Sequence, residues 1–321
     1  MLVPCLLFTL GLVLLIKGGD WFVDAATEIA HHYHVSELII GATVVSIGTT
    51  LPEVMVSATS AFTGHGEIAY GNAIGSIICN TALIAAITIA VRPPKVDVKA
   101  FQSSVIFFFA AAIIYAAIAV YYRAFSRLSG IFFLAYFVGY IIATIYQAKK
   151  TKLQPSEDEA QEAEKTLWKQ IALLIVGAAL IAWGADLLVD NATIIAKKIG
   201  IPEAVIGLTL VALGTSLPEL VTAITSLVKG HGSLSLGNII GANLFNIVLV
   251  SGTATTIRPF EIPLEKYIGS VPTALAVDIP VMLFVMALLT LPPFFSGRMS
   301  RLQGILLLAI YVGFCIFQFA Y

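Results

Sequence analysis

Two glutamates lie deep inside apolar stretches of the chain. Glu53 and Glu219 each end a six-residue segment, GlyThrThrLeuProGlu at 48–53 and GlyThrSerLeuProGlu at 214–219. A carboxylate within a membrane costs a few kcal/mol on insertion scales, so such a residue is a functional candidate. The proline removes a backbone hydrogen-bond donor, and the glycine that opens each segment permits unwinding. We therefore expect backbone carbonyls near each glutamate to turn away from the helix and line a cavity, at Ser46, Thr49, Ala212 and Thr215.

The polar side chains around these glutamates offer oxygen atoms. Hydroxyl groups come from Thr49, Thr50, Thr215, Ser216 and Ser76, and amide oxygens from Asn80 and Asn246. Such a set suits calcium, which takes six to eight oxygens in flexible geometry, and it also suits sodium. Copper, zinc and iron prefer histidine or cysteine, and in the core of the repeated segments, outside their GlyHisGly connections, only Cys79 offers either. The residues indicate an alkali or alkaline-earth cation as the substrate, and they call for no cofactor.

The composition places these residues in a membrane protein. Of the 321 residues 59% are hydrophobic and 12% are charged, whereas ordinary globular domains carry about 25% charged residues. Nothing in the sequence is typical of nucleic-acid binding. Apolar stretches long enough to cross a bilayer predict an all-α polytopic membrane protein with ten transmembrane helices, at 2–30, 36–63, 67–90, 101–121, 128–147, 168–197, 203–229, 233–256, 273–291 and 301–320.

The two halves of the chain repeat each other. Besides the glutamate segments, GlyHisGly at 64–66 returns at 230–232, and GlyAsnAlaIleGly at 71–75 returns as GlyAsnIleIleGly at 237–241, always at an offset of 166 residues. Five helices per half is an odd number, so the second half enters the membrane from the opposite side. Inverted repeats place a transporter's substrate near mid-bilayer. We expect a first repeat at 1–148, a polar linker at 149–167 and a second repeat at 168–321.

Charge sets the expected orientation. With the linker in the cytoplasm, eleven lysines and arginines fall on the cytoplasmic side and six on the other. The excess of positive charge inside predicts that both termini lie outside the cell membrane.

For several other polar residues the sequence predicts no ion-binding role. Asn72 and Asn238 are expected to hydrogen-bond freed carbonyls, and the paired glycines beside them to serve close helix packing. The four aspartates of the first and sixth helices are expected in a wet vestibule or near a helix end rather than at the ion site: Asp20, Asp24, Asp186 and Asp190. Asp278 has no counterpart in the other half, and the sequence suggests no role for it.

The paired segments at 36–80 and 202–246 resemble the two alpha-repeats of the cation/calcium exchanger superfamily, nearest its prokaryotic sodium/calcium exchangers. The resemblance implies one calcium site and several sodium sites at the centre, reached from each side in turn as the first and sixth helices slide across the other eight. It implies that Glu53, Glu219 and the carbonyls of Thr49 and Thr215 hold calcium. Sodium would use both glutamates together with Ser46, Thr50, Ser76, Ala212 and Ser216.

The sequence departs from this family pattern at two positions. Some relatives have an aspartate where this chain has Asn246, and a serine where it has Ala242. Potassium-dependent members likewise use an acid in this region, so nothing here supports potassium transport. The loss of a hydroxyl at Ala242 leaves the number of sodium ions per cycle open.

The counter-ion also stays open on charge alone. Two glutamates carry a charge of −2, which one calcium, two sodium ions or two protons balance equally well. The density of hydroxyl groups favours Ca²⁺/Na⁺ exchange, and a Ca²⁺/H⁺ antiporter is the alternative. An intramembrane hydrolase is a third candidate, but the chain contains no HExxH or GxSxG segment. No protein partner is predicted.

Overall fold

The computed structural model describes residues 2–33, 35–94, 96, 98–150, 157–198, 214–264 and 266–320. Within these residues, nine helical segments are long and apolar enough to cross a membrane. The all-helical membrane fold predicted from composition is confirmed. The tenth predicted span, 203–229, lies partly outside the described residues, which include its second part as helix α11, Leu217–Lys229.

The first half of the chain runs through helices, some of which include wider π-helical turns labelled η. Its elements are α1 (Leu2–His32), α2 (Glu37–Ile40), η1 (Gly41–Val45), α3 (Ser46–Thr63), α4 (Gly66–Cys79), η2 (Asn80–Ala85), α5 (Ala86–Val91), α6 (Val98–Tyr122), strand β1 (Ala124–Phe125) and α7 (Arg127–Lys150).

The second half follows the same plan and adds short strands. It begins with α8 (Glu157–Lys198), which is 42 residues long. After α11 its elements are α12 (Gly232–Phe245), η4 (Asn246–Val250), α13 (Ser251–Ile257), β2 (Phe260–Glu261), β3 (Tyr267–Ile268), β4 (Val271–Pro272), η5 (Ala274–Asp278), α14 (Ile279–Ser296) and α15 (Arg301–Ala320). Strand β1 pairs antiparallel with β2, and β3 with β4.

Much of the predicted polar linker at 149–167 is helical. Helix α7 continues to Lys150, and α8 already begins at Glu157, so the acidic run that follows Glu157 is helical. At 1.5 Å per residue, 42 residues reach well beyond the roughly 30 Å of a hydrocarbon core. The helix therefore continues beyond the membrane, and its acidic first turns belong to that extension.

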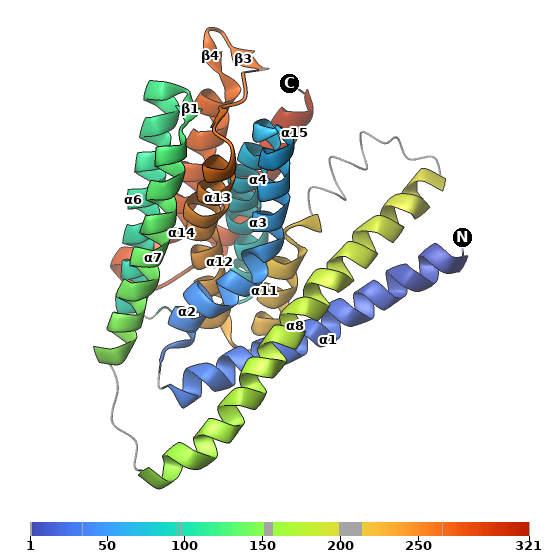
Figure 1. The fold of residues 1–321 in the computed structure, drawn as a ribbon, viewed down its shortest axis with the longest axis vertical. Helices are drawn as coiled ribbons and strands as arrows, with labels where there is room; N and C mark the ends of the chain where they lie inside the picture. Colours follow the sequence, from blue (N-terminus) through green and yellow to red (C-terminus); the bar gives the residue numbers. More distant parts are fainter. Residues whose placement is uncertain are drawn as a thin grey trace.

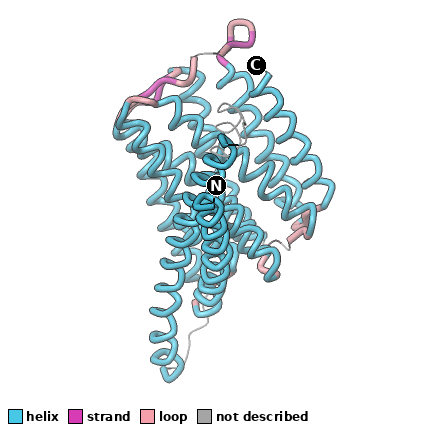
Figure 2. The backbone as a smooth tube through the Cα atoms, turned by 90° about the vertical axis from the view of Figure 1, so that its right-hand side faces the viewer, coloured by secondary structure: helices cyan, strands magenta, loops and turns pink. Residues whose placement is uncertain are grey.

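Helices α1 and α8 form a crossed pair that lies against one side of the other helices (Figure 1, and from the side in Figure 2). They meet at glycines spaced seven residues apart on each helix. A Cβ atom on Gly11 would lie 2.8 Å from the Gly184 carbonyl oxygen, and one on Gly18 would lie 2.9 Å from that of Gly177. Glycine at membrane helix crossings lets two backbones approach closely. These positions are related by the 166-residue repeat, so the crossing is symmetric.

The apolar core is divided in the same way. The larger cluster of buried residues joins α4 to α7 and α12 to α15, with members such as Tyr115 and Phe245, and among the described residues it includes none of α1 or α8. A second cluster holds Leu15 and Phe22 of α1 with Ile181 of α8, and meets the rest of the bundle at α2, η1 and α12. The α1–α8 pair therefore has a core of its own.

The ends of the helices reveal the inverted relation of the repeats. α3 and α11 both end at a glycine with positive φ, Gly64 at 93° and Gly230 at 87°, a conformation that glycine adopts without strain. The Arg258 guanidinium lies beside Gly64, and that of Arg92 lies near Gly230. Each repeat thus places a cation at a helix C-terminus of the other repeat, where the helix dipole favours positive charge.

These contacts define two ends of the molecule. The strand face carries β1 to β4 together with the C-terminal end of α3, and stands uppermost in Figure 1. The His32 face carries the end of α1, the start of α2 and the C-terminal end of α11, because His231 bonds Glu37 across it. α4 runs from the strand face toward the His32 face, and α12 runs the opposite way.

Candidate cation-binding site

In the first repeat, Glu53 lies on α3 and is fully buried. The expectation that Pro52 unwinds this helix is wrong, because α3 is helical from Ser46 to Thr63 with Pro52 inside it. The irregular segment lies earlier, in the π-helical turn η1 that ends directly before Ser46. A π-helical turn inserts an extra residue into the helix, and such turns are frequent at functional sites.

In the second repeat, the chain is unwound where the sequence predicts it. Thr215 and Ser216 form a turn, Ser216 occupies the N-cap position without a side-chain capping bond, and α11 begins at Leu217 with Pro218 in its first turn. Proline is well placed there because the first amides of a helix have no internal partner. Glu219 therefore stands in the first turn of α11, near the positive end of the helix dipole. Ala212, a predicted sodium ligand, lies outside the described residues.

The two glutamates come together in the structure. Glu219 acts electrostatically on Glu53, and the hydroxyl groups of Thr49 and Thr50 lie beside the Glu219 carboxylate. Within the described part of the chain, none of the four carboxylate oxygens of Glu53 and Glu219 has a hydrogen-bond partner of regular geometry. Buried carboxylates without a partner are unstable as bare anions, so a cation or a proton must compensate them.

The two asparagines predicted to offer amide oxygens occupy equivalent special positions. Asn80 is the first residue of the π-helical turn η2, and Asn246 is the first residue of η4. Both side chains are fully buried, and among the described residues none of their amide atoms has a partner. Because buried amides are almost always hydrogen-bonded, these orphaned atoms indicate a missing polar partner at this place.

Hydrogen bonds between the repeats hold the surrounding backbone. The Ser46 hydroxyl donates to the Asn238 carbonyl oxygen at 3.0 Å, and the Thr49 hydroxyl donates to the Asn238 side-chain oxygen at 3.1 Å. Asn72 donates to the Glu53 carbonyl oxygen at 3.1 Å, but this carbonyl lies inside the continuous helix α3 and is not freed by unwinding as predicted. The prediction for Asn238 is wrong, because its side-chain oxygen accepts from Thr49 and, within the described residues, its amide nitrogen donates to no carbonyl.

The remaining predicted ligands differ in burial. Ser76, Ser216 and Ala242 are buried, and Thr215 is partly exposed. Ser216 neighbours Cys79, which ties the start of α11 to α4. The described residues predicted as ligands therefore lie on α3, α4, α11 with the turn before it, and α12, and on the π-helical turns η2 and η4, all of them outside the α1–α8 pair.

Sequence reasoning missed a polar stripe on α11. Thr222 and Ser226 are fully buried, and within the described residues neither hydroxyl group has a partner. They follow Glu219 by three and seven residues, so all three side chains lie on one face of the helix. This helical spacing was the available signal. The stripe leads from the site toward Lys229 at the His32 face.

Two inverted sets of helices around paired buried carboxylates and neutral oxygens define a polytopic membrane transporter of cations. The sequence profile described as "Sodium/calcium exchanger protein" matches residues 3–146 and 169–320. The chain belongs to the sodium/calcium exchanger family, and it is a transporter rather than an enzyme.

Individual proteins resemble this chain over nearly its whole length. The putative antiporter CaxA of Alkalimonas amylolytica is 34% identical, with 98% of each chain covered. The sodium/calcium exchanger MaX1 of Methanosarcina acetivorans is 28% identical, again with 98% of each chain covered. A structure of the sodium-calcium exchanger NCX_Mj superposes with a TM-score of 0.83 at 33% identity and covers 97% of each chain. The exchanger fold expected from the alpha-repeats is confirmed.

Proposed function

We propose that this protein exchanges Ca²⁺ for Na⁺ across the cell membrane, and that both ions bind in turn at one mid-membrane site. Calcium is held by Glu53, Glu219 and the carbonyl oxygens of Thr49 and Thr215. Sodium uses the same glutamates together with nearby oxygen atoms, those of Ser46, Thr50, Ser76, Asn80, Ala212, Ser216, Ala242 and Asn246. The assignment for Ala212 and Ala242 is to backbone oxygens, because alanine has no polar side chain.

The observation that carries this proposal is the unpartnered pair of carboxylates. Both glutamates are 0% exposed, lie close enough to repel each other, and meet no hydrogen-bond donor of regular geometry within the described residues. A pair with charge −2 matches one calcium ion. The surrounding hydroxyl, amide and carbonyl oxygens can complete a hard-ion shell without adding charge.

The family members support this choice and also define its alternative. MaX1 and NCX_Mj are named sodium/calcium exchangers, whereas CaxA is named only as a putative antiporter. Two protons could neutralise the glutamates as well as two sodium ions. The nearby hydroxyls of Thr49 and Thr50 favour sodium, because they can replace part of its hydration shell while a protonated carboxyl needs no such shell. We place the termini outside and the linker in the cytoplasm.

The decisive experiment compares two driving forces in one preparation. The purified protein is reconstituted into vesicles loaded with sodium and diluted into sodium-free buffer that contains ⁴⁵Ca²⁺. A second set carries a pH gradient and no sodium. The proposal expects calcium uptake in the first set only. Omission of potassium from both sides should leave that uptake unchanged, because Asn246 provides no third acid.

Matched vesicles isolate the counter-ion. Sodium-loaded vesicles diluted into equal sodium give the background, and a protonophore added to the sodium-loaded vesicles alone removes any secondary pH gradient there. Uptake driven by pH but not by sodium would replace the proposal with a Ca²⁺/H⁺ antiporter. Uptake in neither set would refute both.

A further inference from the structure

Two aspartates of α1 bind one lysine of α11 at the His32 face. The Lys229 ammonium lies 2.8 Å from Asp24 Oδ1 and 3.3 Å from Asp20 Oδ1, and it donates to the Asp20 carbonyl oxygen at 3.1 Å. The lysine side chain is 24% exposed, against 38% for Asp20 and 61% for Asp24. A single partly buried cation therefore connects the α1–α8 pair to the helix that carries Glu219.

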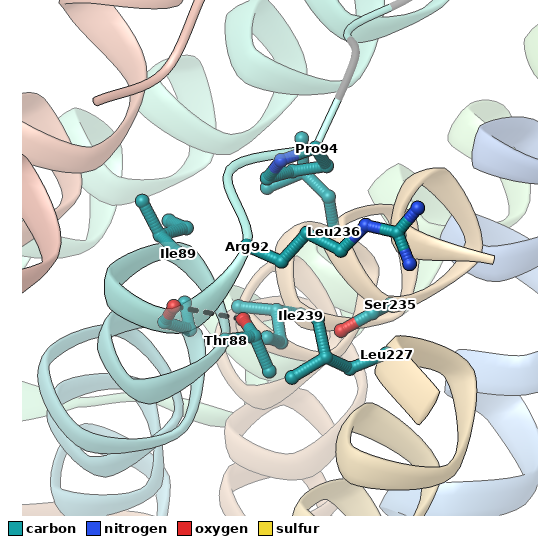
Figure 3. Close-up of a pocket in the computed structure, with 10 residues that line it drawn as sticks. Thr88, Ile89, Arg92, Pro94, Leu227, Ser235, Leu236 and Ile239 are labelled. Carbon is teal, nitrogen blue, oxygen red and sulfur yellow. Dashed lines mark hydrogen bonds between the residues drawn. The ribbon is translucent and has the colours of Figure 1, made fainter. Parts of the chain in front are cut away.

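Beneath this ion cluster, α1 and α11 are in close contact. A Cβ atom on Gly19 would lie 2.8 Å from Val221 Cγ1 and 2.9 Å from the Thr225 hydroxyl oxygen. The polar stripe of α11, Thr222 and Ser226, is completely buried at this level. Nearby, between α5 and the start of α12, the void beside Arg92 measures only about 10 Å³ (Figure 3). The His32 face is closed here.

The equivalent place in the other repeat is open. Met55 is the equivalent of Val221 and Asp186 is the equivalent of Asp20, and both line a cavity of about 780 Å³ between α3 and α8. Gly48 and Pro52, from the segment that carries Glu53, line the same cavity. The two repeats therefore hold different conformations of the same contact, which is closed between α1 and α11 and open between α3 and α8.

The charged residues of this contact differ between the repeats only in the cation. Asp20 and Asp24 return as Asp186 and Asp190, but the equivalent of Lys229 is Thr63, which is exposed and, within the described residues, bonds its own helix and His65. When inverted repeats exchange conformations, α8 closes on α3 while α1 separates from α11. That reverse conformation breaks the ion cluster at Lys229 and has no lysine at position 63 to form a new one.

We propose that Lys229, Asp20 and Asp24 form a one-sided latch that favours the conformation closed at the His32 face. The latch rests on the proposed alternating exchange, since it acts on the equilibrium between the two conformations. It seals the end of the polar stripe that leads from Glu219, and it lowers the population of the reverse conformation without contact with the ions.

Distances between spin labels test the latch without any transport assay. In a variant with its three native cysteines replaced by alanine, one label pair replaces Lys17 and Val228, and a second replaces the equivalent residues Trp183 and Phe62. All four positions are exposed. Lys229→Thr, which copies the residue of the other repeat, should raise the ratio of the reverse to the present conformation by about two- to tenfold. The Lys17–Val228 distance then lengthens and the Trp183–Phe62 distance shortens.

The other repeat offers the matched experiment. Thr63→Lys should favour the same reverse conformation, because it places an ammonium opposite Asp186 and Asp190, and Asp186→Asn should weaken that effect. Lys229→Arg should retain the parent distances, and high salt should weaken the bias. Unchanged distances in both Lys229→Thr and Thr63→Lys would overturn the latch. The label distances do not depend on transport. If they shift as expected in a protein that does not exchange calcium for sodium, the proposed function is refuted and the latch is not.

Discussion

At the scale of single residues, the negative charges of the buried pair Glu53 and Glu219 need compensation. Leaving one charge of a buried pair uncompensated costs about 3–5 kcal/mol. The carboxylates are fully buried, and the described residues nearest Glu219 are neutral hydroxyls. Among the described residues no lysine or arginine acts on either carboxylate, and we therefore assign the balancing charge to a transported cation.

The first prediction replaces each glutamate by its neutral isostere. Glu53→Gln or Glu219→Gln keeps side-chain size but halves the charge that faces calcium, so we expect calcium flux to fall by about 100-fold or more. The measurement is sodium-driven ⁴⁵Ca²⁺ uptake in vesicles. Size-exclusion chromatography of both variants should match the parent, because no described hydrogen bond to the carboxylates is lost. Near-normal flux in both variants would remove the glutamates from the site.

The second prediction concerns Asn246, where the chain departs from some of its relatives. Asn246→Asp adds a third acid to a buried site with two glutamates, and mutual repulsion leaves one of the three protonated at low pH. As pH rises the acid ionises and the site gains a negative charge. The sodium concentration for half-maximal calcium flux should then fall, by roughly tenfold for a full charge near the ion.

The parent protein provides the comparison for this variant, because its Asn246 does not titrate. Flux and sodium dependence are measured from mildly acidic to alkaline pH in both proteins. Identical curves at every pH would show that Asn246 faces away from the ions and is not part of the proposed site.

The sequence predicted the charged residues of the site better than the neutral side chains that hydrogen-bond around them. Glu53 and Glu219 are conspicuous because an acid inside an apolar membrane segment is costly and is therefore rare unless it has a function. Asn238 was assigned the wrong direction of hydrogen bonding, since an amide can donate or accept and its partner is set by the packing of α12 against α3. Lys229 went unnoticed because its aspartate partners are more than 200 residues away.

At the scale of helices, the π-helical turns are the main departure from expectation. The sequence predicts uninterrupted spans at 67–90 and 233–256, yet η2 and η4 interrupt them at Asn80 and Asn246. A single extra residue within a turn leaves no mark on hydrophobic periodicity, so pattern reasoning cannot detect it. Conversely, Pro52 gave a strong signal for a broken helix, but α3 continues through it. Tertiary packing stabilises α3 despite the missing backbone hydrogen bond.

The third prediction tests the crossing of α1 and α8. Gly177→Leu places a side chain where a Cβ atom would already lie 2.8 Å from the Phe22 backbone nitrogen and 3.0 Å from the Gly18 carbonyl oxygen. The helices must separate, so we expect a loss of about 1–3 kcal/mol in stability and reduced transport. Thermal unfolding of the purified protein measures the loss.

Gly139→Leu is the control for this substitution. Gly139 lies on α7, is exposed, and a Cβ atom there would meet no described atom within 4 Å. It should unfold within about 1 °C of the parent, since surface substitutions change stability little. Equal melting temperatures for Gly177→Leu and the parent would show that the α1–α8 crossing contributes no stability.

At the scale of the whole molecule, the sequence predicted the architecture but not its conformation. The 166-residue offset implies two equivalent halves, and the positions of Gly64 with Arg258 and Gly230 with Arg92 agree with it. Repeated segments cannot reveal which half is open, because they specify both arrangements equally well. The cavity lined by Met55 and Asp186 and the closed contact at Gly19 are therefore known only from the structure.

The last prediction joins the site to the stability of the whole fold. Without a bound cation, two fully buried carboxylates repel each other at the centre of the helix bundle. Calcium binds the folded chain and not the unfolded one, so saturating calcium at about 100 times its dissociation constant should stabilise the protein by about 2.7 kcal/mol, a rise of roughly 5 °C in melting temperature. Differential scanning fluorimetry in detergent, started from chelator-treated protein, measures this shift.

Sodium added at fixed calcium should reduce the shift if the two ions share Glu53 and Glu219, because each then displaces the other. Magnesium should give a much smaller shift, since it requires strict octahedral geometry and releases its water reluctantly. Glu53→Gln serves as the matched control, and calcium should leave its melting temperature nearly unchanged. A calcium shift of equal size in Glu53→Gln and in the parent would place the binding ion elsewhere on the molecule and separate it from the buried pair.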